Sequence, residues 1–493
     1  MTSTPGEMGS RFLDGEQDQE STSVRKNIEV DSFGKHKRQY QISAIDFIVK
    51  RRLNAILRAP TGAGKTHIAL RSAEACRVSR IVIFVRRYSG YLSWLKQLSE
   101  SSFASTHNII AMEKFDKEHR QAIWENAKDT DDNEIIICLY ATMLRDKQLI
   151  ERAKVGVFMC DECHILSNPR NITTKAYIRI ARITKASTLF LSDTMMSKGP
   201  QNLFAYLHIL SPKIFSSYWE FVNRYCVMDQ GFKGKEIIAV KKSTKPELLA
   251  RISGFMKNIT DADVAGWVPY RMREVLNVGS PDKKVLKLMS KALTDMMFKT
   301  SDGDLRVIKS YLTSNLVARQ LLTCPALVDT KLGCGIAIDE IVDHAKNRMD
   351  VVHFMLATEF VSAFPHFKKR LESISHALKV FTIIGGMSPS EIVDEIESFA
   401  DCKRNKVDSV LLCGTGVAES FDVMSCDTGY MLGYPYSTTV CRQTEGRLTR
   451  SSVEFPKAFC KFYYVTHGTA IESNVLNVLN TNSQNVTAVM RNK

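Results

Sequence analysis

Residues 59–66, spelled APTGAGKT, place two glycines, a lysine and a hydroxyl in the order of a Walker A phosphate-binding loop. The loop follows a short apolar run, 55–57, and precedes a helical stretch. Glycines let backbone N–H groups turn toward phosphates, and the helix N-terminus adds partial positive charge. We expect Lys65 to meet the β- and γ-phosphates of ATP and Thr66 to ligate Mg²⁺. The loop residues expected to line this site are Thr61, Gly62, Ala63 and Gly64.

An acidic motif, DECH at residues 161–164, directly follows the apolar run 155–160. Ligands of parallel α/β sheets bind at the carboxyl ends of the strands, so both acids are expected beside the phosphate loop. Asp161 is predicted to hold Mg²⁺ through its water shell, and Glu162 to orient and deprotonate the attacking water. His164 either couples this site to nucleic acid or is a satisfied structural histidine, and the sequence leaves both open.

A third motif, QTEGRLTR at residues 443–450, sets Arg447 and Arg450 one helical turn apart on a predicted helix. Guanidinium groups stay charged and can fork onto phosphate oxygens. The pair is therefore predicted to act as arginine fingers on ATP, with Gln443 beside them.

These three motifs, in this order and at domain-sized spacing, resemble those of superfamily-two helicases, over residues 38–465. A narrower likeness is to the Swi/Snf-type DNA translocases, including their compact viral and phage relatives. Residues 38–41, RQYQ, are similar to that family's adenine-reading start, which implies that Arg38 and Gln41 contact the base. Residues 413–423, CGTGVAESFDV, resemble motif five, which implies that Thr415 and Gly416 approach nucleic acid and Asp422 faces the cleft.

Three motifs depart from the Swi/Snf pattern. Motif five lacks the paired glycines usual in that family and is closer to the general helicase form. Motif three reads Ser192-Asp193-Thr194-Met195 instead of S-G-T-P, so a carboxylate stands beside the nucleotide cleft. We expect Asp193 to be paired with a cation, the candidates being Lys198, Arg447 and Arg450. Arg86 replaces the usual proline of motif Ia, where it either contacts a phosphate or solvates a loop.

The resemblance implies an ATP hydrolase that moves along duplex DNA. One alternative is a strand-separating DNA or RNA helicase, which the spelling of motifs five and six supports. Another is a nucleic-acid-binding protein whose ATP site is only structural. Intact Lys65, Asp161 and Glu162 argue against that alternative.

The elements that must position these residues form two α/β series. Apolar runs at 55–57, 80–85, 134–140, 155–160 and 188–192 alternate with helical stretches, which predicts a parallel sheet covered on both faces. A second series has runs at 350–356, 380–384, 409–413, 428–432 and 459–465. Between them the sequence has helical spacing of Lys, Leu and Met. The expected fold is α/β, with two RecA-like lobes at 34–215 and 341–493, a helical insertion and linker at 216–340, and a disordered tail at 1–33.

Composition indicates which class of partner and which cellular compartment to expect. The 493 residues carry a formal net charge of +14, which favours polyanions, although residues 1–31 hold seven acids against Arg11, Arg25 and Lys26. Twelve cysteines without a disulfide framework predict an intracellular protein of the cytoplasm or nucleus, or of a virion or infected cell given the viral resemblance. The first residues contain no secretory signal and the apolar runs are too short to span a bilayer, so no membrane partner is expected.

Overall fold

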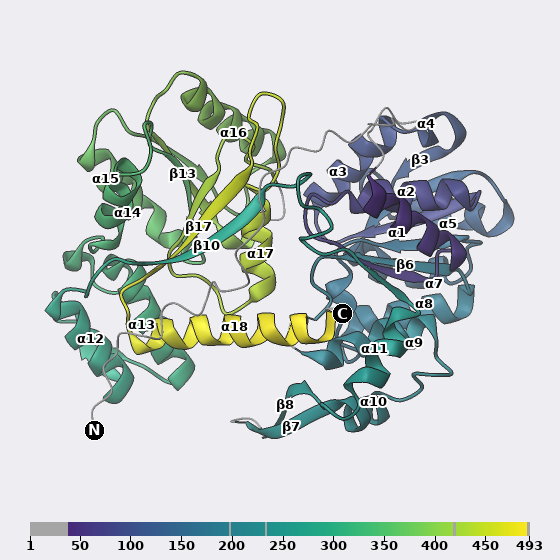
Figure 1. The fold of residues 1–493 in the computed structure, drawn as a ribbon, viewed down its shortest axis with the longest axis horizontal. Coiled ribbons are helices and arrows are strands. Elements are labelled where there is room, and N and C mark those ends of the chain that lie inside the picture. The colour runs from purple at the N-terminus through teal and green to yellow at the C-terminus, as the bar shows by residue number, and fades with distance from the viewer. Residues whose placement is uncertain (1–37, 197–198, 232–233, 418–420, 491–493) are drawn as a thin grey trace. The chain divides into compact units, whose positions relative to one another are not determined.

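The computed structural model describes residues 38–196, 199–231, 234–417 and 421–490. The structure divides into two compact α/β units, and the boundary lies between Trp267 and Val268. We call residues 38–267 the first lobe and residues 268–481 the second lobe (Figure 1). The tail predicted at 1–33 lies outside the described residues.

A seven-stranded sheet of parallel pairs, in the order β3-β4-β2-β5-β6-β1-β9, forms the centre of the first lobe. The helices α1 (Gln39–Lys50), α2 (Lys65–Ala75) and α3 (Tyr88–Ser99) contact one another or the sheet. Others pack into a shared apolar cluster with the sheet, namely α5 (Lys117–Asp129), α6 (Tyr140–Arg145), α8 (Ile172–Thr184) and α9 (Leu203–Leu210). The strands are β1 (Ala55–Arg58), β2 (Arg80–Val85), β3 (Asn108–Ala111), β4 (Glu134–Leu139), β5 (Val157–Cys160), β6 (Ser187–Ser192) and β9 (Met256–Asn258).

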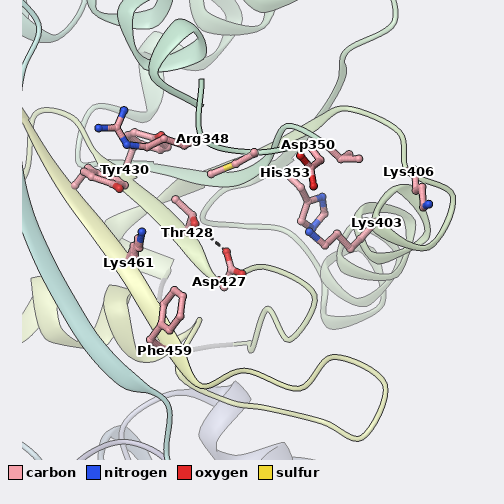
Figure 2. Close-up of a pocket in the computed structure, with 13 residues that line it drawn as sticks. Arg348, Asp350, His353, Lys403, Lys406, Asp427, Thr428, Tyr430, Phe459 and Lys461 are labelled. Atoms are coloured by element: carbon pink, nitrogen blue, oxygen red, sulfur yellow. Dashed lines mark hydrogen bonds between the residues drawn. The ribbon is translucent and has the colours of Figure 1, made fainter. Parts of the chain in front are cut away.

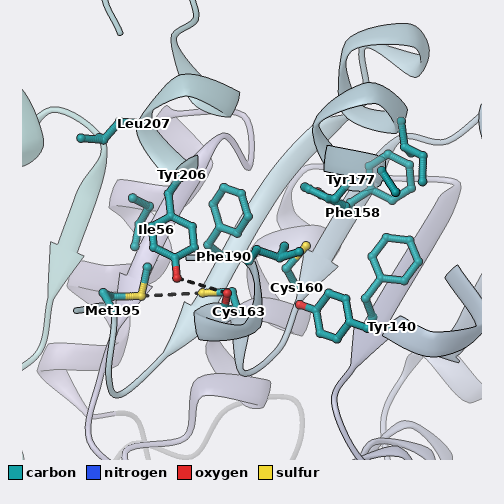
Figure 3. Packing of buried hydrophobic residues seen from close by; sticks show 14 of the residues in the cluster. Ile56, Tyr140, Phe158, Cys160, Cys163, Tyr177, Phe190, Met195, Tyr206 and Leu207 are labelled. Atoms are coloured by element: carbon teal, nitrogen blue, oxygen red, sulfur yellow. Dashed lines mark hydrogen bonds between the residues drawn. The ribbon is translucent and has the colours of Figure 1, made fainter. Parts of the chain in front are cut away.

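Aromatic rings from the strands and the helices pack together in the core of this lobe (Figure 3). The ring of Phe84 lies 5.4 Å from that of Phe158, and Tyr177 of α8 packs edge-on against both and against Phe190. Such pairs add about 0.5–1.5 kcal/mol each beyond the burial of their area. The packing fixes β5 and β6 relative to each other, and these strands lead directly into DECH and motif three.

The second lobe is built on a six-stranded parallel sheet in the order β10-β17-β16-β13-β15-β14. One apolar cluster joins the sheet to α14 (Ala337–Lys346) and α15 (Phe364–Ile374). Another joins it to α16 (Pro389–Arg404), α17 (Thr438–Gly446) and α18 (Ala470–Met490). The strands are β10 (Tyr270–Asn277), β13 (His353–Thr358), β14 (Lys379–Ile383), β15 (Ser409–Gly414), β16 (Thr428–Met431) and β17 (Phe459–Thr466). Two helix-covered parallel sheets confirm the predicted α/β class with two parallel-sheet lobes.

The region predicted as a helical insertion and linker, 216–340, differs from that expectation. It contains helices, α10 (Tyr218–Tyr225), α11 (Lys245–Ser253), α12 (Lys283–Thr294) and α13 (Tyr311–Thr323), and two antiparallel hairpins, β7–β8 (Cys226–Gly231, Gly234–Val240) and β11–β12 (Met297–Lys299, Leu305–Val307). Its strands β9 and β10, however, each complete an edge of one of the main sheets. Both strands are too polar to give the apolar run of a central strand. The first lobe therefore extends past residue 215, to residue 267.

Within the described residues, no helix is both long enough and apolar enough to cross a bilayer.

Candidate functional site

The phosphate-binding loop joins β1 to α2 as the sequence predicts, and its glycines adopt backbone conformations that other residues rarely reach. Gly62 has φ +88° and Gly64, the residue before α2, has φ +83°. A Cβ atom on Gly64 would lie 2.5 Å from Nε2 of Gln41. Conformation and close approach both require glycine at position 64.

Residues of the RQYQ segment contact this loop directly. Gln41 is buried and its Nε2 donates to the carbonyl oxygen of Ala63 at 3.0 Å, while the Tyr40 hydroxyl donates to the same oxygen at 3.2 Å. Arg38 donates to the Tyr40 hydroxyl at 3.1 Å, and its guanidinium lies 4.8 Å from the ring centre of Trp267. These hydrogen bonds hold the phosphate loop against the start of α1. Its predicted contact with adenine stays a prediction.

Lys65 and Thr66 occupy the first turn of α2. The Lys65 ammonium donates to the carbonyl of Ala59 at 3.0 Å, so its side chain folds back over the loop. Thr61 lies in the turn between β1 and α2 and is partly exposed. The structure therefore brings the predicted loop residues together around one helix N-terminus.

Asp161 follows β5 and is held on both carboxylate oxygens. The indole N–H of Trp94 donates to Oδ2 at 2.8 Å, and the backbone N–H of Glu162 donates to Oδ1 at 3.0 Å. Burial and the charge of Glu162 raise the pKa of Asp161 to about 6, against the lowering effects of Trp94 and Lys65. A carboxylate whose charge is disfavoured in this way gains from a nearby divalent cation, and Mg²⁺ prefers such oxygen donors. The residues present fit the predicted metal.

Glu162, His164 and Arg86 form a line from DECH to the loop after β2. Nδ1 of His164 lies 3.2 Å from Oε2 of Glu162, and Arg86 donates to Nε2 of His164 at 2.7 Å. Because a guanidinium only donates, Nε2 accepts, and Nδ1 is left facing Glu162 without a hydrogen bond among the described residues. Glu162 itself adopts φ +46°, a sparsely populated conformation for a residue with a side chain that often marks a functional site. His164 is therefore part of the acidic site, and Arg86 is bound to it rather than standing alone in a loop.

The motif-three turn after β6 is held by Arg58 of β1. Nε of Arg58 donates to the carbonyl of Asp193 at 3.1 Å, and Nη1 donates to Asn258 of β9 at 2.8 Å. The Ser192 hydroxyl accepts from the backbone N–H of Thr194 at 3.1 Å. Asp193 is buried, and its carboxylate makes no ion pair with any described residue. Lys198, one of its predicted partners, lies outside the described residues.

In the second lobe, Arg447 and Arg450 converge on Asp422. Arg450 forms an ion pair with Asp422, and Arg447 lies 3.5 Å from the same carboxylate. Arg447 also donates to the carbonyls of Phe421 and Gln443, at 2.7 and 3.1 Å. The prediction that one helix carries both arginines is wrong, because α17 ends at Gly446 and both arginines lie beyond that residue. A shared carboxylate, not helical spacing, brings them together.

The remaining predicted residues lie at the carboxyl edge of the second sheet or next to the arginines. Thr415 and Gly416 directly follow β15, Thr415 buried and Gly416 exposed with open space around its Cα. Gln443 is buried in α17, and its Nε2 has no hydrogen-bond partner among the described residues. Contacts of these three with nucleic acid or nucleotide stay predictions.

Sequence reasoning missed three residues that hold the site in place. Trp94 orients Asp161, Arg58 holds the motif-three turn, and Glu445 anchors α17. Glu445 is fully buried and accepts two hydrogen bonds from Arg273 of β10, both at 2.6 Å, and one from the Tyr464 hydroxyl at 3.0 Å. An acid in the middle of the arginine motif was the one available signal for Glu445.

Two family models match the chain. Residues 34–195 match the model described as Type III restriction enzyme, res subunit, and residues 336–452 match the helicase conserved C-terminal domain. The first match contains the phosphate loop, DECH and motif three, and the second contains motif five and the arginine motif.

Curated relatives are similar over part of the chain. A SWI/SNF-related matrix-associated actin-dependent regulator of chromatin subfamily A-like protein 1 homolog of Caenorhabditis elegans is 26% identical over 244 residues, 49% of this chain and 34% of the relative. The ISWI chromatin-remodeling complex ATPase ISW1 of Saccharomyces cerevisiae is 22% identical over 191 residues, 37% of this chain and 16% of the relative. The chain thus spans about a third or less of the length of these relatives.

Among solved structures, the chain is similar to the Sulfolobus solfataricus SWI2/SNF2 ATPase core in complex with dsDNA. The TM-score is 0.41 at 17% identity, covering 95% of this chain and 98% of that one.

Proposed function

We propose that this chain, which carries both domains of a superfamily-two helicase, hydrolyses Mg·ATP to move along duplex DNA. The observation that carries the proposal is the cluster at the carboxyl edge of the first sheet. There Lys65 is close enough to influence the pKa of Asp161, and Glu162 stands next to Asp161 with His164 and Arg86 behind it.

Each residue has a role in this proposal. Lys65 neutralises charge on the β- and γ-phosphates, and Asp161 and Thr66 hold Mg²⁺, which supplies further charge neutralisation when bound. Glu162 accepts a proton from the attacking water. His164 orients Glu162 through Nδ1, and Arg86 fixes the ring by donating to Nε2.

The second lobe supplies the arginines in this scheme. Closure of the lobes on ATP would transfer Arg450, and with it Arg447, from Asp422 to the γ-phosphate, and reopening after hydrolysis would advance the motor along DNA. Thr415 and Gly416 are the proposed contacts to the DNA backbone.

The partial likeness to Swi/Snf-related proteins supports duplex DNA as the track. A strand-separating DNA or RNA helicase is the second candidate, because motifs five and six follow the general helicase spelling. Assignment to the compact viral or phage branch stays a prediction, as does the place of action in the cytoplasm, the nucleus or an infected cell.

The test measures ATP turnover with no polymer, with duplex DNA, with single-stranded DNA and with RNA. Duplex DNA should stimulate turnover most, and its effect should fall steeply as salt rises because bound phosphates release counterions. Lys65→Ala should weaken nucleotide binding, whereas Glu162→Gln should bind ATP and lose turnover. Near-normal turnover by Glu162→Gln would refute the assignment, and stimulation by RNA alone would refute the duplex-DNA track.

A further inference from the structure

A hollow of about 510 Å³ opens at the amino-end edge of the second sheet, where β13, β16 and β17 begin (Figure 2). Its lining comes from the ends of α14 and α16 and from the first residues of these strands. Thr415 and Gly416 follow the carboxyl end of β15 and so belong to the opposite edge of the sheet. The hollow is therefore distinct from the motor site.

Four cations face this hollow: Arg348, Lys403, Lys406 and Lys461. Among the described residues, none of the four forms an ion pair. Figure 2 shows Arg348 and Lys461 on one side and Lys403 and Lys406 on the other, with His353 and Asp427 between them. Two separated pairs of cations without an ion pair among the described residues thus line one hollow.

Two histidines near these cations have lowered pKa values. Burial, together with the charges of Arg348 and Lys461, lowers the pKa of His344 to about 4. Burial, together with the charges of Lys403 and Lys457, lowers the pKa of His353 to about 3. Both rings are neutral at physiological pH, and His353 is fixed by hydrogen bonds to Ser409 at 2.8 Å and Ser425 at 3.3 Å. His353, which lines the hollow, is therefore a neutral side chain held in place by two hydrogen bonds.

Hydrogen-bond acceptors and an aromatic ring lie between the two pairs of cations. Asp350 and Asp427 line the hollow, and the Thr428 hydroxyl donates to Asp427 at 2.8 Å. Phe459 is 45% exposed, with the Lys461 ammonium 5.6 Å from its ring centre. Carboxylates placed between cations suit a ligand that has hydroxyl groups between its anionic groups.

Helix termini explain only part of this arrangement. Lys403 lies in the last turn of α16 and Arg348 just after α14, where a cation stabilises the helix dipole by about 0.3–1 kcal/mol. Lys461 belongs to a strand, so no helix dipole accounts for it. A helix terminus alone also does not require a lined hollow.

We propose that this hollow binds a small polyhydroxylated molecule that carries phosphates at two separated positions. One phosphate lies between Arg348 and Lys461, another lies against Lys403 and Lys406, and hydroxyls between them donate to Asp427 and Asp350. The volume falls within the range of small-molecule sites. A nucleic-acid backbone fits less well, because its continuous phosphates would meet the two carboxylates.

The experiment is calorimetric titration of the full chain with inositol hexakisphosphate and with fructose 1,6-bisphosphate. All proteins carry Lys65→Ala, so that the phosphate loop does not compete. Lys403→Ala/Lys406→Ala and Arg348→Ala/Lys461→Ala each remove one side of the site. Lys368→Ala/Lys369→Ala is the matched control, since both lysines are exposed on α15 and lie outside the hollow.

At least one of the two probes should bind the parent, and each site pair should weaken binding by about tenfold or more, because charge-assisted bonds to phosphate are lost. The control should bind as the parent does, and Lys403→Arg/Lys406→Arg should restore binding, which a folding defect would not allow. Absence of binding by the parent, equal weakening by the control, or binding of a phosphoserine peptide but of neither probe would overturn the proposal. Because ATP turnover is not measured, failure here leaves the proposed motor untouched.

Discussion

Asp161 is the residue whose protonation most directly limits the proposed chemistry. Its pKa is about 6, and only the ionised form can hold Mg²⁺. Mg²⁺ affinity should therefore be full above this pKa and fall as the pH drops through about 6. Trp94→Phe removes the donor that lowers this pKa, so the decline should begin at a higher pH and Mg²⁺ should bind about 10–100-fold more weakly.

Mg²⁺ titration of ATP turnover at several pH values measures both effects. Trp124→Phe is the control, since Trp124 is equally buried in the same lobe but its indole N–H donates to Asp146 instead. A Trp94→Phe profile that coincides with that of the parent would show that the indole does not orient the metal ligand.

Asp193 provides a second prediction at the scale of a residue. We favour pairing of its carboxylate with a cation in the working motor, where Lys198, Arg447 and Arg450 are the candidates. Asp193→Gly should then leave ATP turnover similar or lower and impair movement on DNA, scored by displacement of a triplex-forming strand. A variant that hydrolyses and moves faster than the parent would instead mark Asp193 as a defect in a weakened motor.

The sequence locates the residues of the site better than it locates their supports. Lys65 and Asp161 were predictable because each lies at the end of an apolar strand in a motif of fixed spacing. Trp94 was not, because a tryptophan on an amphipathic helix has the pattern of a core residue, and only the fold brings it to an acid 67 residues away.

At the scale of elements, Glu445 ties the arginine motif to a strand from the middle of the chain. Its carboxylate accepts from Arg273 and lies 4.0 Å from Arg271, both on β10. Burial alone would raise the pKa of Glu445, but Arg273, Arg271 and the Tyr464 hydroxyl together outweigh burial and lower it below its usual value of 4.5. The stabilisation is therefore complete above about pH 4.5 and is lost as pH falls through the lower, folded-state pKa.

Glu445→Gln should destabilise the protein by about 3–5 kcal/mol at neutral pH, because two arginines lose their buried partner. Thermal melting of parent and variant should show the largest difference at neutral pH and a smaller one in acid. Glu454→Gln is a control, since Glu454 pairs with Arg404 on an exposed surface and should contribute little. A difference between Glu445→Gln and parent that grows in acid would contradict the assigned sign.

The sequence did not predict the sheet-edge strand β3, and it misplaced the edge strands β9 and β10 in the insertion. Interior strands such as β2 and β15 were predictable within a residue because both of their faces are buried. An edge strand does not need a continuous run of apolar residues. In addition, β9, with the sequence MKN, has only three residues. Their pairing depends on partners far away in sequence, which local patterns do not encode.

For the whole molecule, this correction gives a direct prediction about where the first lobe ends. A fragment of residues 38–215 lacks Leu248, Ile252 and Met256, which belong to the core of that lobe, and also lacks the strand that covers β1. Each buried aliphatic side chain contributes about 1.5–3 kcal/mol. Fragment 38–267 should therefore unfold cooperatively in urea, and fragment 38–215 at a much lower midpoint or without a transition. Equal midpoints would restore the boundary at residue 215.

The pairing of β1 also sets the schedule on which the chain can fold as it leaves the ribosome. β1 lies between β6 and β9, so the strand that leads into the phosphate loop is synthesised about 130 residues before its first neighbour and about 200 before its second. β10 likewise waits for β17, near the end of the chain. Until then both strands expose unpaired edges. A chaperone therefore has the longest opportunity to bind at β1, which leads into the phosphate loop, and at β10, which carries Arg271 and Arg273.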